Sequence, residues 1–413
     1  MTLHNKHYLR FILIFIATIF YFLANIQRVS VPGAIFDNLQ SDFMTDASRI
    51  TLLGAVFCYI YAITQLVVGL LVDKIGGFRV VALGCIIFSI GAIIFPFCNN
   101  LVLLYLSRAF LGFGAATFYL STIREVKKYS KDKNFSLSVS YILFIGYSGG
   151  IIANAPFVFF VNQWGWRAAL GAIGVFTLVL GLVYLIVLFI FKPVHIEKKT
   201  KFSLSPFLEV LSKKENINLY LFGSINYGLY YVLQSVIGKK FLEDFCFIGV
   251  NKAALILSIM ALISAFSGTI TAFVSKCFLN NKRAIIFKTF AFLSFLSCLS
   301  VCLCLVFNIH TKLIALIFCI PSFIGSISPL LILTLHLYNR YQVSATAVSI
   351  QNFGFFMTVG LLGTIIGLLM NVFEPIKNDS GVLVYSNNSY LLVFGLFLIL
   401  SLVEFYYSLK IKD

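Results

Sequence analysis

The sequence predicts an all-α integral membrane protein with twelve transmembrane helices, arranged as two halves of six. Of its 413 residues, 60% are hydrophobic and 11% are charged, whereas a soluble domain is about 45–50% apolar and ~25% charged. Twelve apolar stretches approach or exceed the length of ~20 residues that crosses a bilayer. A basic segment, 192–217, separates the first six stretches from the last six.

The two predicted halves are residues 1–191 and 218–413, and residues 192–217 form a basic cytoplasmic linker between them. The expected spans, in chain order, are 9–31, 51–72, 79–98, 101–123, 136–161, 167–191, 218–238, 252–276, 284–307, 312–337, 344–372 and 389–409.

The distribution of Lys and Arg predicts the orientation. With the N-terminus inside, the inner segments carry 21 Lys and Arg, the outer ends and loops carry 8, and Arg108 and Lys288 lie within spans. Because cytoplasmic loops are enriched in Lys and Arg, both termini are expected in the cytoplasm, in a multi-pass inner (plasma) membrane protein. The net charge of +16 lies in these loops, so membrane lipid is the expected partner and nucleic acid is not.

The polar turn after the second span contains Gly69, Asp73, Gly76 and Arg79. Gly69 lies one helical turn before Asp73 and is expected to let a neighbouring backbone approach closely. The Asp73 carboxylate can bind the positive end of another helix, or an Arg. We assign these four residues to gating; a simple basic turn is the alternative.

The fourth span carries Arg108, followed on the same face by Gly112, Ala115 and Tyr119. An Arg inside a membrane span normally faces a cavity or a partner. Arg108 therefore either contacts the substrate or gate, with Tyr119 beside it and Gly112 assisting gating, or it pins helices by bonding backbone carbonyls.

Together, these segments resemble the major facilitator superfamily. The segment 69–80 is similar to its signature between helices 2 and 3, residues 108–116 to its helix 4 pattern, and residues 164–167 to its turn between helices 5 and 6. The resemblance implies a transporter in which two six-helix halves rock about a midplane site and expose it to each side in turn.

Polar side chains at the outer end of the first span predict a substrate site. Tyr21, Asn25 and Arg28 share one helix face, and Arg28 can hold a carboxylate with two hydrogen bonds. Arg28 reaching the outer headgroups is the alternative. The segment 28–32 resembles the bacterial phagosomal nutrient transporters, which implies uptake of an amino acid or nucleoside.

Three further spans supply polar groups that are expected to line the cavity, because such groups are costly when they face lipid. Hydrogen bonding between helices is the alternative for any one of them. The candidate substrate-binding residues here are Asn154, Asn226, Tyr230, Gln234, Gln351 and Asn352.

The leading interpretation is a monomeric, non-enzymatic transporter that imports a small nutrient, most simply an amino acid. A co-transported proton stays open, because Glu404 is the one acid clearly inside a span. Export of an amphipathic compound is the first alternative. An intramembrane serine protease is a remote one, because residues 146–150 match G-x-S-x-G around Ser148 but lie inside a helix. The nine Cys form no C-x-x-C pair, so no metal or cofactor is expected.

Overall fold

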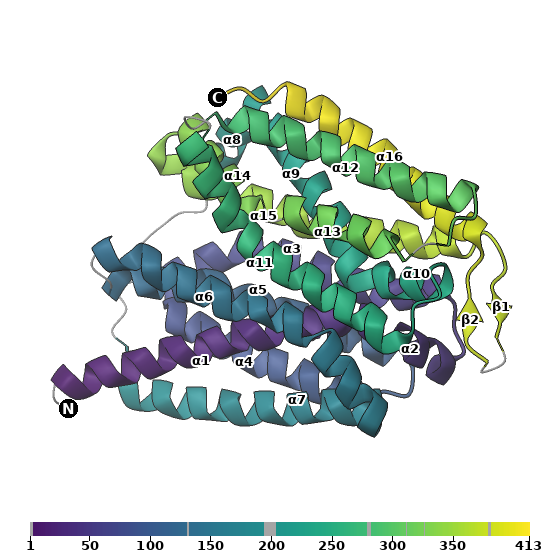
Figure 1. Cartoon of the computed structure of the whole chain (residues 1–413). Helices are drawn as coiled ribbons and strands as arrows, with labels where there is room; N and C mark the ends of the chain where they lie inside the picture. Colours follow the sequence, from purple (N-terminus) through teal and green to yellow (C-terminus); the bar gives the residue numbers. More distant parts are fainter. Residues whose placement is uncertain are drawn as a thin grey trace. The chain divides into compact units, whose positions relative to one another are not determined.

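The computed structural model describes residues 3–129, 132–193, 204–278, 282–310, 312–325, 327–378 and 381–413. The middle of the predicted linker, 194–203, lies outside the described residues. The described chain is almost entirely helical (Figure 1). Its first elements are α1 (Leu3–Ser30), η1 (Gly33–Ile35), α2 (Phe36–Phe43), α3 (Ala47–Ile75), α4 (Gly77–Ile94), η2 (Phe95–Phe97), α5 (Leu101–Tyr129), α6 (Asp132–Ile152) and α7 (Ala155–Phe191).

The later elements include one short hairpin, in the loop before the last helix. They are α8 (Ser205–Leu211), α9 (Lys214–Val232), the π-helical turn η3 (Leu233–Ile237), α10 (Gly238–Asp244), α11 (Val250–Phe278), α12 (Arg283–Val306), α13 (Ile314–Ile324), α14 (Ser328–Tyr338), α15 (Tyr341–Met370), β1 (Ile376–Lys377), β2 (Leu383–Val384) and α16 (Asn387–Leu409). The two strands pair antiparallel, with Ile376 opposite Val384.

The chain folds into two compact units. Unit 1 comprises residues 1–30 and 56–202, and unit 2 comprises residues 31–55 and 203–413. Residues 31–55, which follow the first helix, therefore belong with the second unit. The predicted boundary between halves at 192–217 stays a prediction.

Within unit 1, α1 packs on α6, and α4 packs on both α5 and α7 (Figure 1). Small residues allow this close packing. A Cβ added to Gly112 of α5 would lie 2.5 Å from the Phe57 carbonyl oxygen of α3, and one added to Gly149 of α6 would collide with the Phe22 carbonyl oxygen of α1. The match around Ser148 is thus part of a helix contact, and the Ser148 hydroxyl donates to the Ile145 carbonyl of its own helix at 2.7 Å.

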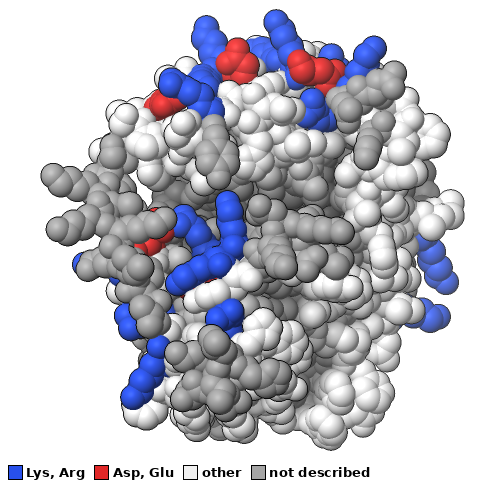
Figure 2. All heavy atoms as spheres, turned by 90° about the vertical axis from the view of Figure 1, so that its left-hand side faces the viewer, with Lys and Arg blue, Asp and Glu red and all other residues white. Residues whose placement is uncertain are grey.

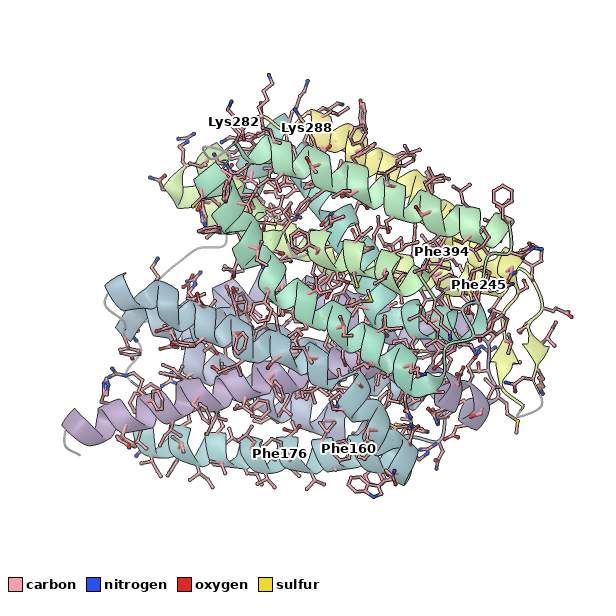
Figure 3. The ribbon with its side chains drawn as sticks, viewed as in Figure 1. Phe160, Phe176, Phe245, Lys282, Lys288 and Phe394 are labelled. Atoms are coloured by element: carbon pink, nitrogen blue, oxygen red, sulfur yellow. The ribbon has the colours of Figure 1, made fainter. Side chains whose placement is uncertain are left out.

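Within unit 2, α16 packs along α12 and α9, and α15 packs on α9. Phe241 of α10 anchors the end of the seventh span: its ring centroid lies 4.7 Å from that of Phe394 of α16 and 5.4 Å from that of Phe245. Figure 3 labels Phe245 and Phe394 in this region.

Ten helices of the described chain are long and apolar enough to cross a membrane. The difference from the predicted twelve comes from interruptions. The predicted fifth span is broken between α6 and α7 at Ala153 and Asn154, and the seventh changes to a π-helical turn at Leu233. The predicted tenth span also consists of two pieces, α13 and α14, but it is counted among the ten.

Side chains on the outside of α7 are suited to lipid. Figure 3 shows Phe160 and Phe176 pointing away from unit 1, and they are 43% and 53% exposed. All nine Cys are free, and Cys277 is the one among them that is exposed.

Candidate functional site

Two buried arginines form the centre of unit 1. Arg108 of α5 is 0% exposed, and Arg28 of α1 is 6% exposed. The Cys58 thiol of α3 lies within range of both guanidinium charges. Helices far apart in the sequence thus bring two permanent positive charges into one region, because Arg cannot lose its proton in a protein.

Both arginines contact neutral groups. Arg108 donates from Nη1 to the Gln27 carbonyl of α1 at 2.8 Å, and its guanidinium lies 4.7 Å from the Phe57 ring centroid. Arg28 donates from Nη2 to Oδ1 of Asn25 and lies 5.8 Å from the Tyr61 ring centroid. These groups help to hold the two guanidinium planes in position.

Several predicted site residues gather around this pair. Asn25 links Arg28 to the helix, because its Nδ2 donates to the Tyr21 carbonyl at 2.9 Å. The Tyr21 ring lies 5.3 Å from that of Tyr119 and 6.2 Å from that of Tyr147. The structure therefore places Tyr21, Asn25 and Arg28 together, with Tyr119 of α5 beside Tyr21. The helix-face argument predicts the first three, and the contact of Tyr119 with Tyr21 was not predicted.

Arg108 fits the helix-pinning interpretation through its bond to the Gln27 carbonyl. That bond does not exclude a substrate contact, because a guanidinium has five N–H donors. Asn154 lies at the break between α6 and α7, is 1% exposed, and donates from Nδ2 to the Gly150 carbonyl at 2.9 Å.

The turn between α3 and α4 is built around two acids. Asp73 pairs with Arg124 of α5, from Oδ1 to Nη1 at 2.5 Å. Glu125 accepts from the backbone N–H of Gly77 at 2.7 Å, at the start of α4. Gly76 has a φ of 90°, which favours glycine at this turn. Of the two predicted kinds of partner, Asp73 therefore binds an arginine. The hydrogen bond from Gly77 to Glu125 was not predicted.

Gly69 and Gly112, which are both predicted to act in gating, differ in how closely a neighbouring backbone approaches them. For Gly69 the predicted close backbone approach is not found: among the described residues, an added Cβ would have only Nη2 of Arg124 nearby, at 3.9 Å. Gly112 has the close approach instead, against Phe57. Arg79 is exposed at the start of α4. A gating role for Gly69, Asp73, Gly76, Arg79 and Gly112 stays a prediction.

In unit 2, the seventh-span residues face partly inward. Asn226 of α9 donates from Nδ2 to Oε1 of Glu404 of α16 at 2.8 Å. Asn226 and Tyr230 also line a cavity of about 10 Å³ between α9, α12, α13 and α16. Gln234 is buried in the π-helical turn. The bond between Asn226 and Glu404 has no counterpart among the sequence predictions.

The two candidates on α15 have different surroundings. Gln351 is 0% exposed, and its Nε2 approaches the Ser224 hydroxyl of α9 at 3.4 Å. Asn352 is half-buried. The contact of Gln351 links α15 to α9, which is the alternative interpretation of interhelical bonding.

An ion cluster at the end of the seventh span was not predicted. Nζ of Lys240 lies 2.8 Å from Oδ1 of Asp37 and 3.0 Å from Oδ1 of Asp244. Oδ2 of Asp244 accepts from the Tyr390 hydroxyl at 2.7 Å. The spacing of Lys240 and Asp244 at i and i+4 could have predicted their ion pair. Asp37 of α2 is 203 positions from Lys240, and no local pattern predicts that contact.

Comparison with known proteins decides the family. The profile of the Major Facilitator Superfamily matches residues 11–368. The chain belongs to the Major Facilitator Superfamily. The all-α membrane fold is thereby confirmed.

Several named transport proteins are similar to this chain at low identity. The sodium-dependent phosphate transport protein 1 of Arabidopsis thaliana chloroplasts is 27% identical over 40% of this chain. The sulfoacetate transporter SauU of Cupriavidus necator, itself assigned as probable, is 24% identical over 42% of this chain. The alignments span 32% and 40% of those relatives' own lengths.

Solved structures show the same fold along the chain. A bacterial homologue of the human lysosomal transporter Spinster, in an inward-facing and unoccupied conformation, has a TM-score of 0.76 at 16% identity, covering 98% of each chain. The nucleoside transporter NupG has a TM-score of 0.72 at 15% identity, covering 96% of this chain and 99% of its own.

The superfamily turn at residues 164–167 is a structural element here. Gly165, with a φ of 79°, interrupts α7. Arg167 then donates from Nη1 to the carbonyls of Pro96 at 2.8 Å and Cys98 at 3.0 Å, and its guanidinium lies 4.4 Å from the Trp166 ring centroid. Arg167 thus satisfies carbonyls at the end of η2 that the helix leaves open.

Proposed function

We propose that this superfamily member imports a small organic anion through the inner (plasma) membrane by alternating access, with both termini in the cytoplasm. Its substrate carries a carboxylate, and an amino acid is the first one to test. Lys and Arg predominate over Asp and Glu on the face drawn in Figure 2, which supports a membrane protein with a basic cytoplasmic side.

The pair of buried arginines in unit 1 carries this proposal. Arg28 and Arg108 place two permanent positive charges in buried positions, and such charges attract a negative ligand. A guanidinium binds a carboxylate or phosphate through two parallel hydrogen bonds. Tyr21, Asn25 and Tyr119 supply aromatic faces and an amide beside Arg28, which suits a ligand with a short organic body.

The names of the relatives support an anionic substrate class. Two relatives are named for the transport of phosphate and of sulfoacetate, which are both anions. A third relative is named an ascorbate transporter. An amino acid shares the carboxylate, but carries an amine as well. The substrate panel should therefore include an amino acid, ascorbate, sulfoacetate and inorganic phosphate.

Uptake by Arg28→Gln tests the proposal. A hydrogen bond to a charged group contributes about 1.5–3 kcal/mol, so apparent affinity should fall roughly ten- to over a hundred-fold, at 1.4 kcal/mol per decade. The loss should shrink for a substrate analogue whose carboxylate is replaced by a carboxamide, because that analogue lacks the charge that Arg28 binds.

Arg49→Gln is the matched control, because Arg49 is exposed beside Asp46 in the first turn of α3. It should leave uptake of both compounds unchanged. If Arg28→Gln weakens uptake of the acid and its carboxamide equally, Arg28 is an anchor and the carboxylate contact is refuted.

A further inference from the structure

Glu404, on the last helix, is a fully buried acid of unit 2. It is 0% exposed. Oε1 accepts from Nδ2 of Asn226 at 2.8 Å, whereas Oε2 has no hydrogen-bond partner among the described residues. The Ser294 side chain of α12 is the other polar group beside it.

No cation balances this carboxyl within the described part of unit 2. None of its ion pairs includes Glu404. The helices that pack on α16 supply Cys298 from α12 and Tyr230 from α9 as the titratable groups nearby, and α15 carries no Asp, Glu, Lys, Arg or His. Lys282 and Lys288, near the start of α12, point away from unit 2 (Figure 3).

A carboxyl in such a place is stable when neutral. Burying an ionised carboxylate without a counter-charge is very costly, whereas a neutral carboxyl with a hydrogen bond is tolerated. The buried arrangement therefore corresponds to one bound proton. Release of that proton would need a change of conformation that gives the carboxyl access to water.

The neighbouring cavity fits a proton and not the substrate. Its volume of about 10 Å³ holds about one water molecule, and its lining includes Asn226 and Ser294, the two polar neighbours of Glu404. Asn226 and Tyr230 belong to the predicted substrate stripe of the seventh span. The carboxyl is thus one hydrogen bond away from a helix that is expected to respond to the substrate.

We propose that Glu404 is a proton-binding site and that the proton taken up there accompanies the substrate into the cell. This inference rests on the proposed function. In the step itself, a carboxylate binds one proton from outer water to give a carboxylic acid, which later returns that proton to inner water. Asn226 is a positioning residue, because it orients the carboxyl by donating to Oε1.

Reconstituted protein can test this directly. The full chain in liposomes is given a pH gradient of one unit, acidic on the side from which substrate enters, with each anion of the panel. One proton per substrate supports up to about a tenfold gain in accumulation, since one pH unit is a tenfold ratio of proton activity. Glu404→Gln should show no gain, yet keep exchange of labelled for unlabelled substrate without a gradient.

Two matched variants complete the design. Glu209→Gln makes the same chemical change at a glutamate of α8 that pairs with Arg340, and it should accumulate substrate like the wild type. Glu404→Asp keeps the carboxyl and should restore part of the gain. If Glu404→Gln accumulates substrate like the wild type, the proposal is overturned.

Infrared difference spectroscopy gives a readout that needs no substrate. The carbonyl band of a protonated carboxyl should be present in the wild type, disappear as the pH is raised, be absent in Glu404→Gln and shift in Glu404→Asp. An unchanged band in the Gln variant refutes the proton site. Absence of both exchange and accumulation in the wild type refutes the transport proposal instead, while the infrared result still decides the role of Glu404.

Discussion

The buried charges of the two units solve the same problem in opposite ways. In unit 1, Arg28 and Arg108 stay charged and are held by a backbone carbonyl, an amide and aromatic rings. In unit 2, Glu404 has one amide partner and can discharge itself by taking a proton. A buried guanidinium is a fixed charge, and a buried carboxyl is a switchable one. Fixed charges suit binding an anion, and a switchable one suits coupling.

The largest effect is expected when the guanidinium of Arg108 is replaced by an ammonium group. Arg108→Lys keeps the positive charge but replaces a planar fork by a point charge on a flexible stem. Loss of hydrogen bonds from a charged group, at about 1.5–3 kcal/mol, should lower uptake by at least about tenfold. Uptake is compared at equal amounts of protein in the membrane. Full uptake by the Lys variant would show that only the charge of Arg108 matters.

A smaller effect is expected from removing the partner of the switchable charge. Asn226→Leu leaves Oε1 of Glu404 without its donor, which should cost about 1–2 kcal/mol, or roughly 2–8 °C in melting temperature. The double variant Asn226→Leu/Glu404→Leu should be less destabilised, because both polar groups are gone. The melting temperatures in detergent decide this. A double variant as unstable as the sum of the single ones would mean that the pair is not coupled.

The third effect depends on pH and concerns Glu243 of α10, beyond the seventh span. Burial raises its pKa to about 7, although Lys239 lies 2.9 Å away and opposes the shift. The folded protein then binds more protons than the unfolded chain between about pH 4.5 and 7, so stability should fall as the pH rises through this window. Melting temperatures at pH 5 and pH 8 measure this fall. Glu243→Gln should flatten it, and an equal fall in that variant would assign it to other groups.

The sequence was sufficient where a signal is local. Apolar length predicted the spans, and the helix-face spacing of Tyr21, Asn25 and Arg28 placed them correctly in one cluster. Helix breaks were harder, because Asn154 and the π-helical turn at Leu233 interrupt stretches that are apolar enough on average to be taken as single spans. A length criterion sees no boundary in such stretches.

Partners far apart in the chain were the main loss. Asp73 offered two kinds of partner, and only the fold selects Arg124 over a helix end. Asn226 and Glu404 are 178 positions apart, so their bond depends on how α9 packs on α16. The sequence shows Glu404 as an acid inside a span, but the inference of a proton-binding site depends on its neighbours in the fold.

The contact of Lys240 with Asp37 sets an order of events during synthesis. Asp37 is made 203 residues before its partner, and translation adds about 5–20 residues per second. The segment 31–55 therefore waits roughly 10–40 s for Lys240 to be made. Unit 2 can be completed only after most of unit 1 has left the ribosome, although residues 31–55 of unit 2 are among the first to be synthesised.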